Sequence, residues 1–340
     1  MLAAHIKRYG GPEQLIVGEL PEPIPGPSDL LVTVAAASVN PIDFKLREGK
    51  LKALMPLPMP LILGNDLSGT VLAIGANVSR FKIGDRIVAR LDKKRIGAFA
   101  ERAVVGESEA ALAPMRIDLI DAAALPLAGL TAWQALFELG QLAAGQSLLV
   151  HAGAGGVGHF ALQLGRWRGA RVIATAGASN RERCLALGAD EVIDYRSVRF
   201  ESAVRDVDVV LDTQGGETLL RSIAVTRRGG HVISITAMPT PEVARSWGIG
   251  PPLTWALAWM TRRERAAAQA YGVHYHYLFM RPDGRLLEEL VKLVDAGTLT
   301  PVIDRRYPLT EAAAALAHVQ KGHTIGKVLV VPGKANANVR

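Results

Sequence analysis

Cysteine is almost missing from this sequence. Cys184 stands alone among 340 residues, so the chain can form no internal disulfide and no metal site built from several thiolates. Long apolar runs are missing too, because the longest stretch without Asp, Glu, Lys or Arg, 139–165, is rich in glycine and interrupted by Gln and His. We therefore expect no membrane span. Residues 1–10 lack an apolar signal core, which favours a cytoplasmic location.

Positive charge exceeds negative charge but is concentrated nowhere. The net charge is +7, yet the densest basic groups, at 93–95, 227–228 and 262–265, are too short to follow a phosphate backbone. We expect no nucleic-acid partner and interpret these groups as a solvated basic face. With 49% hydrophobic and 21% charged residues, the composition is typical of a folded globular protein, and the length favours two domains.

The first part of the chain, up to about residue 115, predicts a β-rich domain. Proline and glycine punctuate short runs of β-branched residues, and the prolines within 21–27 predict an extended edge segment. The expected strands are residues 31–34, 70–74, 87–89 and 97–105.

Between about 120 and 236 the pattern changes to strands alternating with amphipathic helices. This alternation is typical of an α/β fold with a doubly wound parallel sheet, the Rossmann fold. Ser179, with Glu182 three residues later, predicts a capping box that opens a helix running to Gly188. The other expected elements are strands at 147–151, 171–175, 191–195, 207–212 and 231–236, a helix ending at Gly169, and a helix at 218–226 closed by Gly229 and Gly230.

The remaining chain divides into an irregular part and a regular part. Residues 239–280 follow no single period and are predicted to be an insertion. Helices at 286–294 and 310–322 are followed by a strand at 327–331, which suggests that the chain returns to complete its first domain. The predicted domains are a β-rich one of residues 1–120 and 270–340 and a Rossmann one of residues 121–269.

A glycine motif lies between the first strand and the first helix of the predicted parallel sheet. Gly153, Ala154, Gly155, Gly156 and Val157, followed by Gly158, match the pattern G-x-G-x-x-G. Glycines permit the tight turn and let backbone N–H groups approach a pyrophosphate, which the helix N-terminus also attracts. The sequence therefore predicts a dinucleotide site.

The choice of dinucleotide follows from a missing acid. An NAD site usually carries Asp or Glu about 20 residues beyond the glycines, but residues 175–181 contain none. Gly177, Ser179 and Arg181 lie there instead, and a cation at a helix start suits a 2′-phosphate, so NADP(H) is predicted. Arg181 could equally be an ordinary exposed arginine. Tyr195, after the next strand, could flank the phosphate or adenine, or simply pack.

Segments spread over nearly the whole chain form a specific set. They are Asn-Pro-Ile-Asp at 40–43 with Arg-Glu-Gly at 47–49, 64–69, 81–86, 125–132, the glycine motif, and Gly-Lys-Val at 326–328. The set resembles the zinc-independent quinone oxidoreductase and enone reductase branch of the medium-chain dehydrogenase/reductase superfamily. This resemblance implies a GroES-like β-rich catalytic domain completed by the C-terminus, a Rossmann domain and an active site in the cleft between them.

Zinc-dependent members of that superfamily differ from this chain at their metal ligands. They carry Cys where this chain has Asn40, and a His-Glu pair where it has Asn65 and Asp66. No zinc site is expected here. Without a Lewis acid, hydride transfer favours acceptors that delocalise developing charge, namely quinones and α,β-unsaturated carbonyls. A ketone or alcohol dehydrogenase and a non-catalytic NADPH-binding regulator remain alternatives.

The resemblance also implies catalytic residues. It places Asn40, Asp43 and Lys45 on the segment that faces the nicotinamide, and the Asp-Phe-Lys of residues 43–45 is closer to the enone-reducing branch. Lys45 could stabilise an enolate or donate a proton, or it could be a solvated lysine paired with Asp43 or Glu48. Asn40 could bind the acceptor carbonyl or hold the loop.

Further cofactor contacts are implied by the same resemblance. Thr131 corresponds to a threonine near the nicotinamide, although it could instead cap a helix. Gln214 and Ile235 follow two strands, at the sheet edge where ligands collect. Phe279, His323 and Lys327 complete the predicted contacts, although His323 could be a surface histidine. The family also implies a homodimer through edge strands of the Rossmann sheets.

Overall fold

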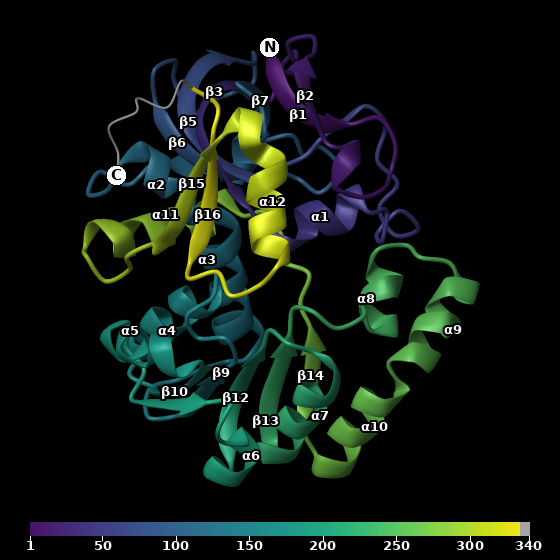
Figure 1. Cartoon of the computed structure of the whole chain (residues 1–340), viewed down its shortest axis with the longest axis vertical. Coiled ribbons are helices and arrows are strands. Elements are labelled where there is room, and N and C mark those ends of the chain that lie inside the picture. The colour runs from purple at the N-terminus through teal and green to yellow at the C-terminus, as the bar shows by residue number, and fades with distance from the viewer. Residues whose placement is uncertain (334–340) are drawn as a thin grey trace. The chain divides into compact units, whose positions relative to one another are not determined.

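A computed structural model describes residues 1–333 of the chain, which fall into two compact units. Unit 1 consists of Met1–Leu130 and Arg281–Arg340, and unit 2 of Thr131–Met280 (Figure 1). Residues 334–340, which the predicted first domain includes, lie outside the described residues.

Unit 1 is built on two sheets. Its strands are β1 (Leu2–Ile6), β2 (Ile16–Glu19), β3 (Asp29–Val39), β4 (Leu61–Ile62), β5 (Asp66–Ile74), β6 (Arg86–Arg90), β7 (Arg102–Gly106), β8 (Ala110–Leu112), β15 (Ile303–Pro308) and β16 (Lys327–Val331). The larger sheet has the order β15-β16-β3-β5-β6-β8, with β7 also paired to β3, and the smaller one is β2-β1-β4. Residues 97–101, expected to open a strand, precede β7 instead.

The C-terminal strand completes the sheet of unit 1, as the sequence predicts. β16 pairs antiparallel with β3, with Val328 opposite Val39. The helices of this unit are α1 (Pro41–Arg47), α2 (Leu119–Ala122), α11 (Gly284–Asp295) and α12 (Ala312–Gln320), with short 3-10 turns at Pro12–Gln14, Glu107–Glu109 and Leu309–Glu311. Helix α3 (Pro126–Trp133) crosses from unit 1 into unit 2 and continues as a π-helix (Gln134–Leu139). Thr131 therefore lies inside a helix, so the alternative role of capping its start is excluded.

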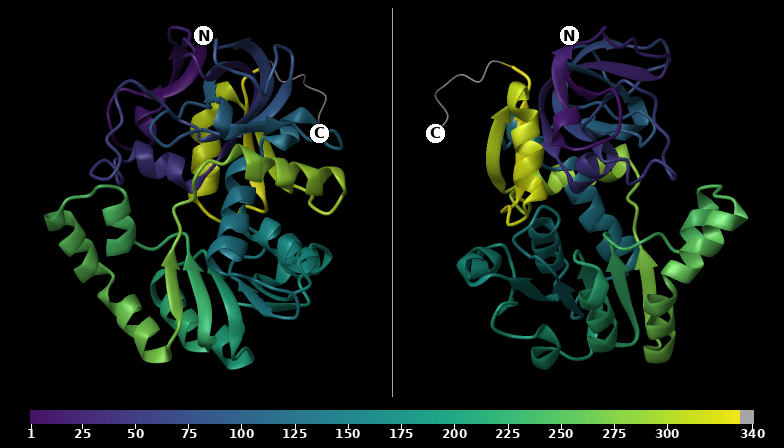
Figure 2. Two further views of the ribbon diagram at one scale, coloured as in Figure 1. Left: turned by 180° about the vertical axis from the view of Figure 1, so that it is seen from behind. Right: turned by 45° about the vertical axis from the view of Figure 1, so that its right-hand side comes forward.

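Unit 2 is a six-stranded parallel sheet with helices between its strands (Figure 2). Its strands are β9 (Ser147–Val150), β10 (Arg171–Ala176), β11 (Glu191–Asp194), β12 (Val207–Asp212), β13 (Thr226–Ser234) and β14 (His274–Tyr277). Its helices are α4 (Gly158–Trp167), α5 (Arg181–Ala186), α6 (Phe200–Ala203), α7 (Gly216–Val225), α8 (Pro241–Ser246), α9 (Pro251–Met260) and α10 (Arg262–Tyr271). The strand order β11-β10-β9-β12-β13-β14 reverses direction between β9 and β12, and such a switch point is where parallel sheets bind ligands.

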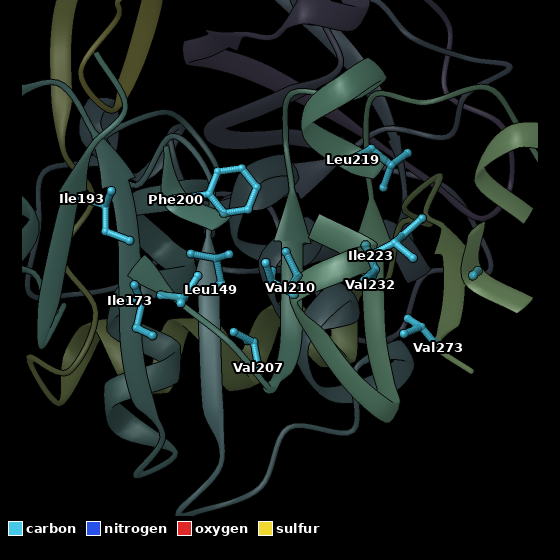
Figure 3. Packing of buried hydrophobic residues seen from close by; sticks show 13 residues of the cluster. Leu149, Ile173, Ile193, Phe200, Val207, Val210, Leu219, Ile223, Val232 and Val273 are labelled. Atoms are coloured by element: carbon cyan, nitrogen blue, oxygen red, sulfur yellow. The ribbon is translucent and has the colours of Figure 1, made fainter. Parts of the chain in front are cut away.

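The core of unit 2 explains why these strands are apolar. Leu149, Ile173, Val210 and Val232 come from four neighbouring strands and form one buried cluster with Phe200 and residues of α7 (Figure 3). Parallel strands covered by helices read as continuous hydrophobic runs, which is the pattern seen in the sequence.

Three local predictions for unit 2 need correction. The chain forms a 3-10 turn at Ala178–Asn180, and α5 begins at Arg181 with no side-chain cap, so Ser179 does not form the predicted capping box. Gly229 and Gly230 lie inside β13 instead of closing α7. The predicted insertion contains three helices and β14, which pairs with β13, so residues 274–277 belong to the Rossmann sheet and not to the first domain.

Candidate functional site

The glycine motif forms the turn between β9 and α4. Ala152 has φ of 51°, which opens a tight loop. A Cβ at Gly158 would lie 2.2 Å from the Ala152 carbonyl oxygen, so only glycine fits at that position. At Gly155 the same oxygen would be 3.2 Å away, which is close but less severe. The motif glycines therefore have a structural requirement as well as the predicted ligand role.

The loop presents free backbone donors at the start of a ten-residue helix. Within residues 1–333, the N–H groups of Ala154, Gly156 and Val157 donate to no acceptor. Helix α4 begins directly after them, and its N-terminus carries partial positive charge. Free N–H groups at such a position bind phosphate oxygens. The residues present therefore fit the pyrophosphate of a dinucleotide.

Asp212 organises the neighbouring strand ends. This buried carboxylate accepts hydrogen bonds from the backbone N–H groups of Gln214 and Gly215, each at 3.0 Å, and from the Ser234 hydroxyl at 2.6 Å. The backbone N–H of Ile235 donates to the Asp212 carbonyl at 3.1 Å. The two predicted residues Gln214 and Ile235 are thus held at adjacent strand ends. Sequence reasoning missed Asp212, although an acid ending an apolar strand before Gly-Gly was a usable signal.

Tyr195 and Arg196 approach the end of β10 next to Gly177. A Cβ at Gly177 would lie 3.9 Å from the Arg196 guanidinium carbon and 4.0 Å from a Tyr195 ring atom. The Arg196 guanidinium also lies 5.6 Å from the centre of the Tyr195 ring, a cation–π arrangement. Arg196 was not among the predicted residues. It places a cation beside the carboxyl end of β10, where the sequence has no acid.

Arg181, the predicted phosphate ligand, is partly committed elsewhere. One of its terminal nitrogens donates to the Val192 carbonyl on β11 at 2.6 Å. This bond anchors α5 to β11 and leaves the other guanidinium donors for a ligand. Ser179 stands in the turn just before Arg181.

The remaining predicted cofactor residues are spread over both units. In unit 2, Phe279 packs edge-on against Trp247 with ring centres 5.0 Å apart, and Thr131 is buried. In unit 1, His323 is exposed with φ of 67°, in the turn before β16.

A buried polar cluster in unit 1 engages both ends of the Asn40 amide. Its nitrogen donates to Asp66 Oδ1 at 2.8 Å and to the Ser38 carbonyl at 3.0 Å. Its oxygen accepts from Lys327 Nζ at 2.5 Å. The amide therefore holds the loop, and no amide hydrogen of Asn40 remains for an acceptor carbonyl. Lys327, predicted as a cofactor contact, lies buried in this cluster.

Asp43 adds a second carboxylate to the cluster. Its oxygens accept from the Asn65 amide at 2.6 Å and from the backbone N–H of Asn40 at 2.8 Å. Burial raises the pKa of Asp43 to about 7, against the lowering effect of these hydrogen bonds. The carboxyl thus fixes the start of α1 and titrates near neutrality.

Lys45 stands apart from this cluster. Glu48 pairs with Lys50 at 2.6 Å, and Asp43 is occupied by its hydrogen bonds, so neither carboxylate pairs with Lys45 in the described part of the chain. Partial burial, and secondarily the nearby Lys50, lower the pKa of Lys45. A half-buried ammonium of lowered pKa can release a proton more readily than a solvated one.

Over residues 1–333, no three His, Cys, Asp or Glu side chains are placed to hold a metal ion. No helix in that same range is long and apolar enough to cross a bilayer.

The fold and these clusters define a class, a two-unit dehydrogenase with a β-rich unit and a dinucleotide-binding unit. Residues 26–115 match the alcohol dehydrogenase GroES-like domain, and residues 187–330 match a family described as zinc-binding dehydrogenase. The chain is 33% identical to a quinone-oxidoreductase homolog of Spinacia oleracea chloroplasts over 95% of each chain. It belongs to the zinc-independent quinone oxidoreductases of the medium-chain dehydrogenase/reductase superfamily.

Two further comparisons agree with this family. The NADPH-dependent alkenal/one oxidoreductase of Arabidopsis thaliana chloroplasts is 32% identical, over 95% of this chain and 78% of that protein. The solved quinone oxidoreductase of Coxiella burnetii has a TM-score of 0.85 and 31% identity, covering 97% of this chain and 99% of that one.

Proposed function

We propose that this protein is a zinc-independent oxidoreductase that uses NADP(H) and transfers hydride to quinones or α,β-unsaturated carbonyls. The observation that carries the proposal is the glycine loop, whose three N–H groups without an acceptor suit a pyrophosphate. The names of its relatives, which state quinone reduction and NADPH-dependent alkenal reduction, support the acceptor class.

The preference for NADP(H) is assigned to the end of β10. Gly177, Ser179, Arg181 and Tyr195 are the proposed contacts, together with Arg196. Two guanidinium groups and a tyrosine, with no acid in residues 175–181, favour a 2′-phosphate over a free ribose hydroxyl.

The nicotinamide half is assigned to the remaining predicted contacts. Thr131, Gln214, Ile235, Phe279 and His323 are the proposed contacts. Gln214 and Ile235 have support from Asp212, which fixes their backbone. Lys327 receives a different role, because its ammonium already donates to Asn40. We assign it to holding Asn40 and not to touching the cofactor.

The chemistry divides between the cofactor and the chain. Bound NADPH supplies the hydride. Lys45 stabilises the negative charge that develops on the acceptor oxygen and provides a proton. Asn40 and Asp43 position the start of α1, and hence Lys45, through the buried cluster. No Lewis acid is required when the acceptor delocalises its charge.

The first test is consumption of NADPH, and separately of NADH, with a polycyclic ortho-quinone, a simple enone, an alkenal and a saturated ketone. Turnover with NADPH and the conjugated acceptors is expected. Turnover of the saturated ketone alone would instead favour a ketone or alcohol dehydrogenase. Binding of NADPH without any turnover would favour a non-catalytic regulator.

A homodimer through β14 and a cytoplasmic location complete the proposal. β14 stands at the end of the strand order, so one of its edges has no partner strand in the described chain. Such an edge can pair with a second copy. Light scattering on purified protein tests the dimer, and a monomeric protein would contradict it.

A further inference from the structure

Helix α9 exposes an unusual apolar face. Trp255 and Trp259 are 72% and 66% exposed, and Met260 is 47% exposed. The tryptophans stand four residues apart, so they share one side of the helix. No residue of α9 carries a charge. Two large exposed indoles on one side of a helix are a candidate interaction surface, whereas Met260 lies further round the helix and also lines a cavity.

The elements around α9 leave this face uncovered. In both views of Figure 2, α9 lies at the margin of unit 2, between α8 and α10, which it contacts. The inward side is occupied by Leu257 and Thr254, which are buried. The helix is thus anchored by one side and presents the tryptophans with the other.

Arginines border the apolar face. Arg262, Arg263 and Arg265 lie in the first turn of α10, which begins two residues after Met260, and Glu264 is the one acid in residues 251–271. Glu264 is half-buried and lines a cavity of about 220 Å³ with Tyr275, so its charge does not stand among the three arginines on the surface. The three arginines outnumber the two acids beside them, Glu242 near Arg265 and Glu217 near Arg263, so this boundary carries excess positive charge.

One arginine is coupled directly to the face. The Arg262 guanidinium lies 4.1 Å from the centre of the Trp259 ring and donates to the Trp259 carbonyl at 2.7 Å. Arg263 pairs with Glu217 at 3.3 Å, but both side chains are about two-thirds exposed, so this ion pair is weak. Stacked indole and guanidinium groups with one apolar and one charged side are suited to a boundary between lipid and water.

We propose that Trp255, Trp259 and Met260, with Arg262, Arg263 and Arg265, form a docking surface for an anionic lipid bilayer. Tryptophan is enriched at the headgroup level of membranes, and neighbouring arginines bind anionic headgroups while their stems lie on apolar surface. Charge complementarity favours this occupant over a second copy of the chain. Two such faces would bring arginines against arginines, and the chain as a whole carries a net charge of +7.

The test is co-sedimentation of the full chain with vesicles. One set contains phosphatidylcholine alone, and the other contains phosphatidylcholine and phosphatidylglycerol in a roughly 2:1 ratio. Binding to the anionic vesicles only is expected, and high salt should weaken it. The variant Arg262→Gln/Arg265→Gln should reduce the partition coefficient about 25-fold, since each cation near the surface contributes about fivefold. Trp255→Ala/Trp259→Ala should abolish binding.

Two control variants distinguish binding through this surface from non-specific binding of the protein to vesicles. Ile24→Ala removes a hydrophobic side chain that is 90% exposed in unit 1, and Arg199→Gln removes an arginine whose side chain is 76% exposed. Both should bind vesicles as the wild type does. The replaced side chains are exposed, so all variants should keep the wild-type melting temperature.

Three results would overturn the proposal. These are no binding to anionic vesicles, equal binding to neutral ones, or unchanged binding of the tryptophan variant. A wild-type dimer that becomes a monomer in Trp255→Ala/Trp259→Ala, measured by light scattering, would assign the face to a second copy and would also overturn it. None of these readouts depends on enzymatic turnover.

Discussion

Lys327 donates to the side-chain oxygen of Asn40 across 2.5 Å, although the two residues stand 287 positions apart in the chain. Lys327 is on the last strand and Asn40 caps α1, so the contact ties the end of the chain to the segment assigned to catalysis. Burial lowers the pKa of Lys327, while the charges of Asp66 and Asp43 raise it. Lys327 is thus a buried cation close to the buried carboxyl groups of Asp66 and Asp43.

Lys327→Met should destabilise the protein. The substitution leaves the Asn40 oxygen without its donor and removes one of the two buried cations, Lys327 and Arg90, that act on the carboxyl groups of Asp43 and Asp66. The expected cost is about 3 kcal/mol in the free energy of unfolding. Urea denaturation measures it. Lys321→Met, at an exposed lysine before the same strand, should have little effect. Equal stability of the two variants would contradict the structural role of Lys327.

Asp43 should give the stability of the protein a characteristic pH dependence. Burial raises the pKa of this carboxyl from 3.8 to about 7, so the folded state binds the proton more tightly than the unfolded state. The stability of the wild type relative to Asp43→Asn should therefore fall as pH rises from about 4 to about 7 and then level off. The slope should be at most about 1.4 kcal/mol per pH unit.

Melting temperatures of both proteins across this range measure the effect. A difference that grows in favour of the wild type with rising pH would mean that the hydrogen bonds from Asn40 and Asn65 outweigh burial. The pKa of Asp43 would then be lowered.

Gly158→Ala should remove both cofactor binding and part of the stability. The new methyl group would meet the Ala152 carbonyl oxygen at 2.2 Å, which forces the loop to change shape. We expect a loss of at least about 2 kcal/mol in unfolding free energy, and no NADPH binding by fluorescence titration. Gly250→Ala is the control, because nothing lies within 4 Å of a Cβ there and its φ of −65° suits alanine.

Arg196→Ala should change the choice of cofactor. Loss of the guanidinium beside Gly177 should weaken NADPH binding about tenfold, as expected for a lost charged hydrogen bond, and leave NADH binding nearly unchanged. Arg181→Ala should act in the same direction. Arg199→Ala, whose arginine pairs with Glu201, should affect neither cofactor. If both variants lost as much affinity for NADH as for NADPH, neither arginine would be a ligand of the 2′-phosphate.

Lys45→Met should lower turnover while leaving cofactor affinity intact. Loss of a positioned proton donor typically costs about a hundredfold in rate, so kcat for an enone should fall by that order while the Kd for NADPH stays the same. Lys52→Met, at an exposed lysine seven positions further along the chain, serves as the control. Unaltered turnover in Lys45→Met would contradict the role of Lys45 as proton donor.

The local parts of this protein were predictable from the sequence. The glycine loop, the strands at 171–176 and 207–212, and the terminal strand at 327–331 each depend on short-range patterns of apolar residues and turn residues. The helix α5 was predicted, but its start was not, because Ser179 forms a 3-10 turn that an isolated capping motif does not reveal. The structure of residues 239–280 could not be predicted from local patterns. Each of helices α8 to α10 packs against the rest of the unit through one side only, and β14 is a strand because it pairs with β13.

Sequence alone therefore determined the two-part fold, the dinucleotide loop and the absence of the zinc ligands at positions 40, 65 and 66. Each of these can be recognised from the identity and spacing of residues that are close together in the chain. Tertiary structure decided which polar groups meet. It placed Lys327 on Asn40, Arg196 beside Gly177 and Asp212 under the strand ends. Burial then made those contacts necessary, since a polar group removed from water needs a partner, and the fold alone determines which partner is within reach.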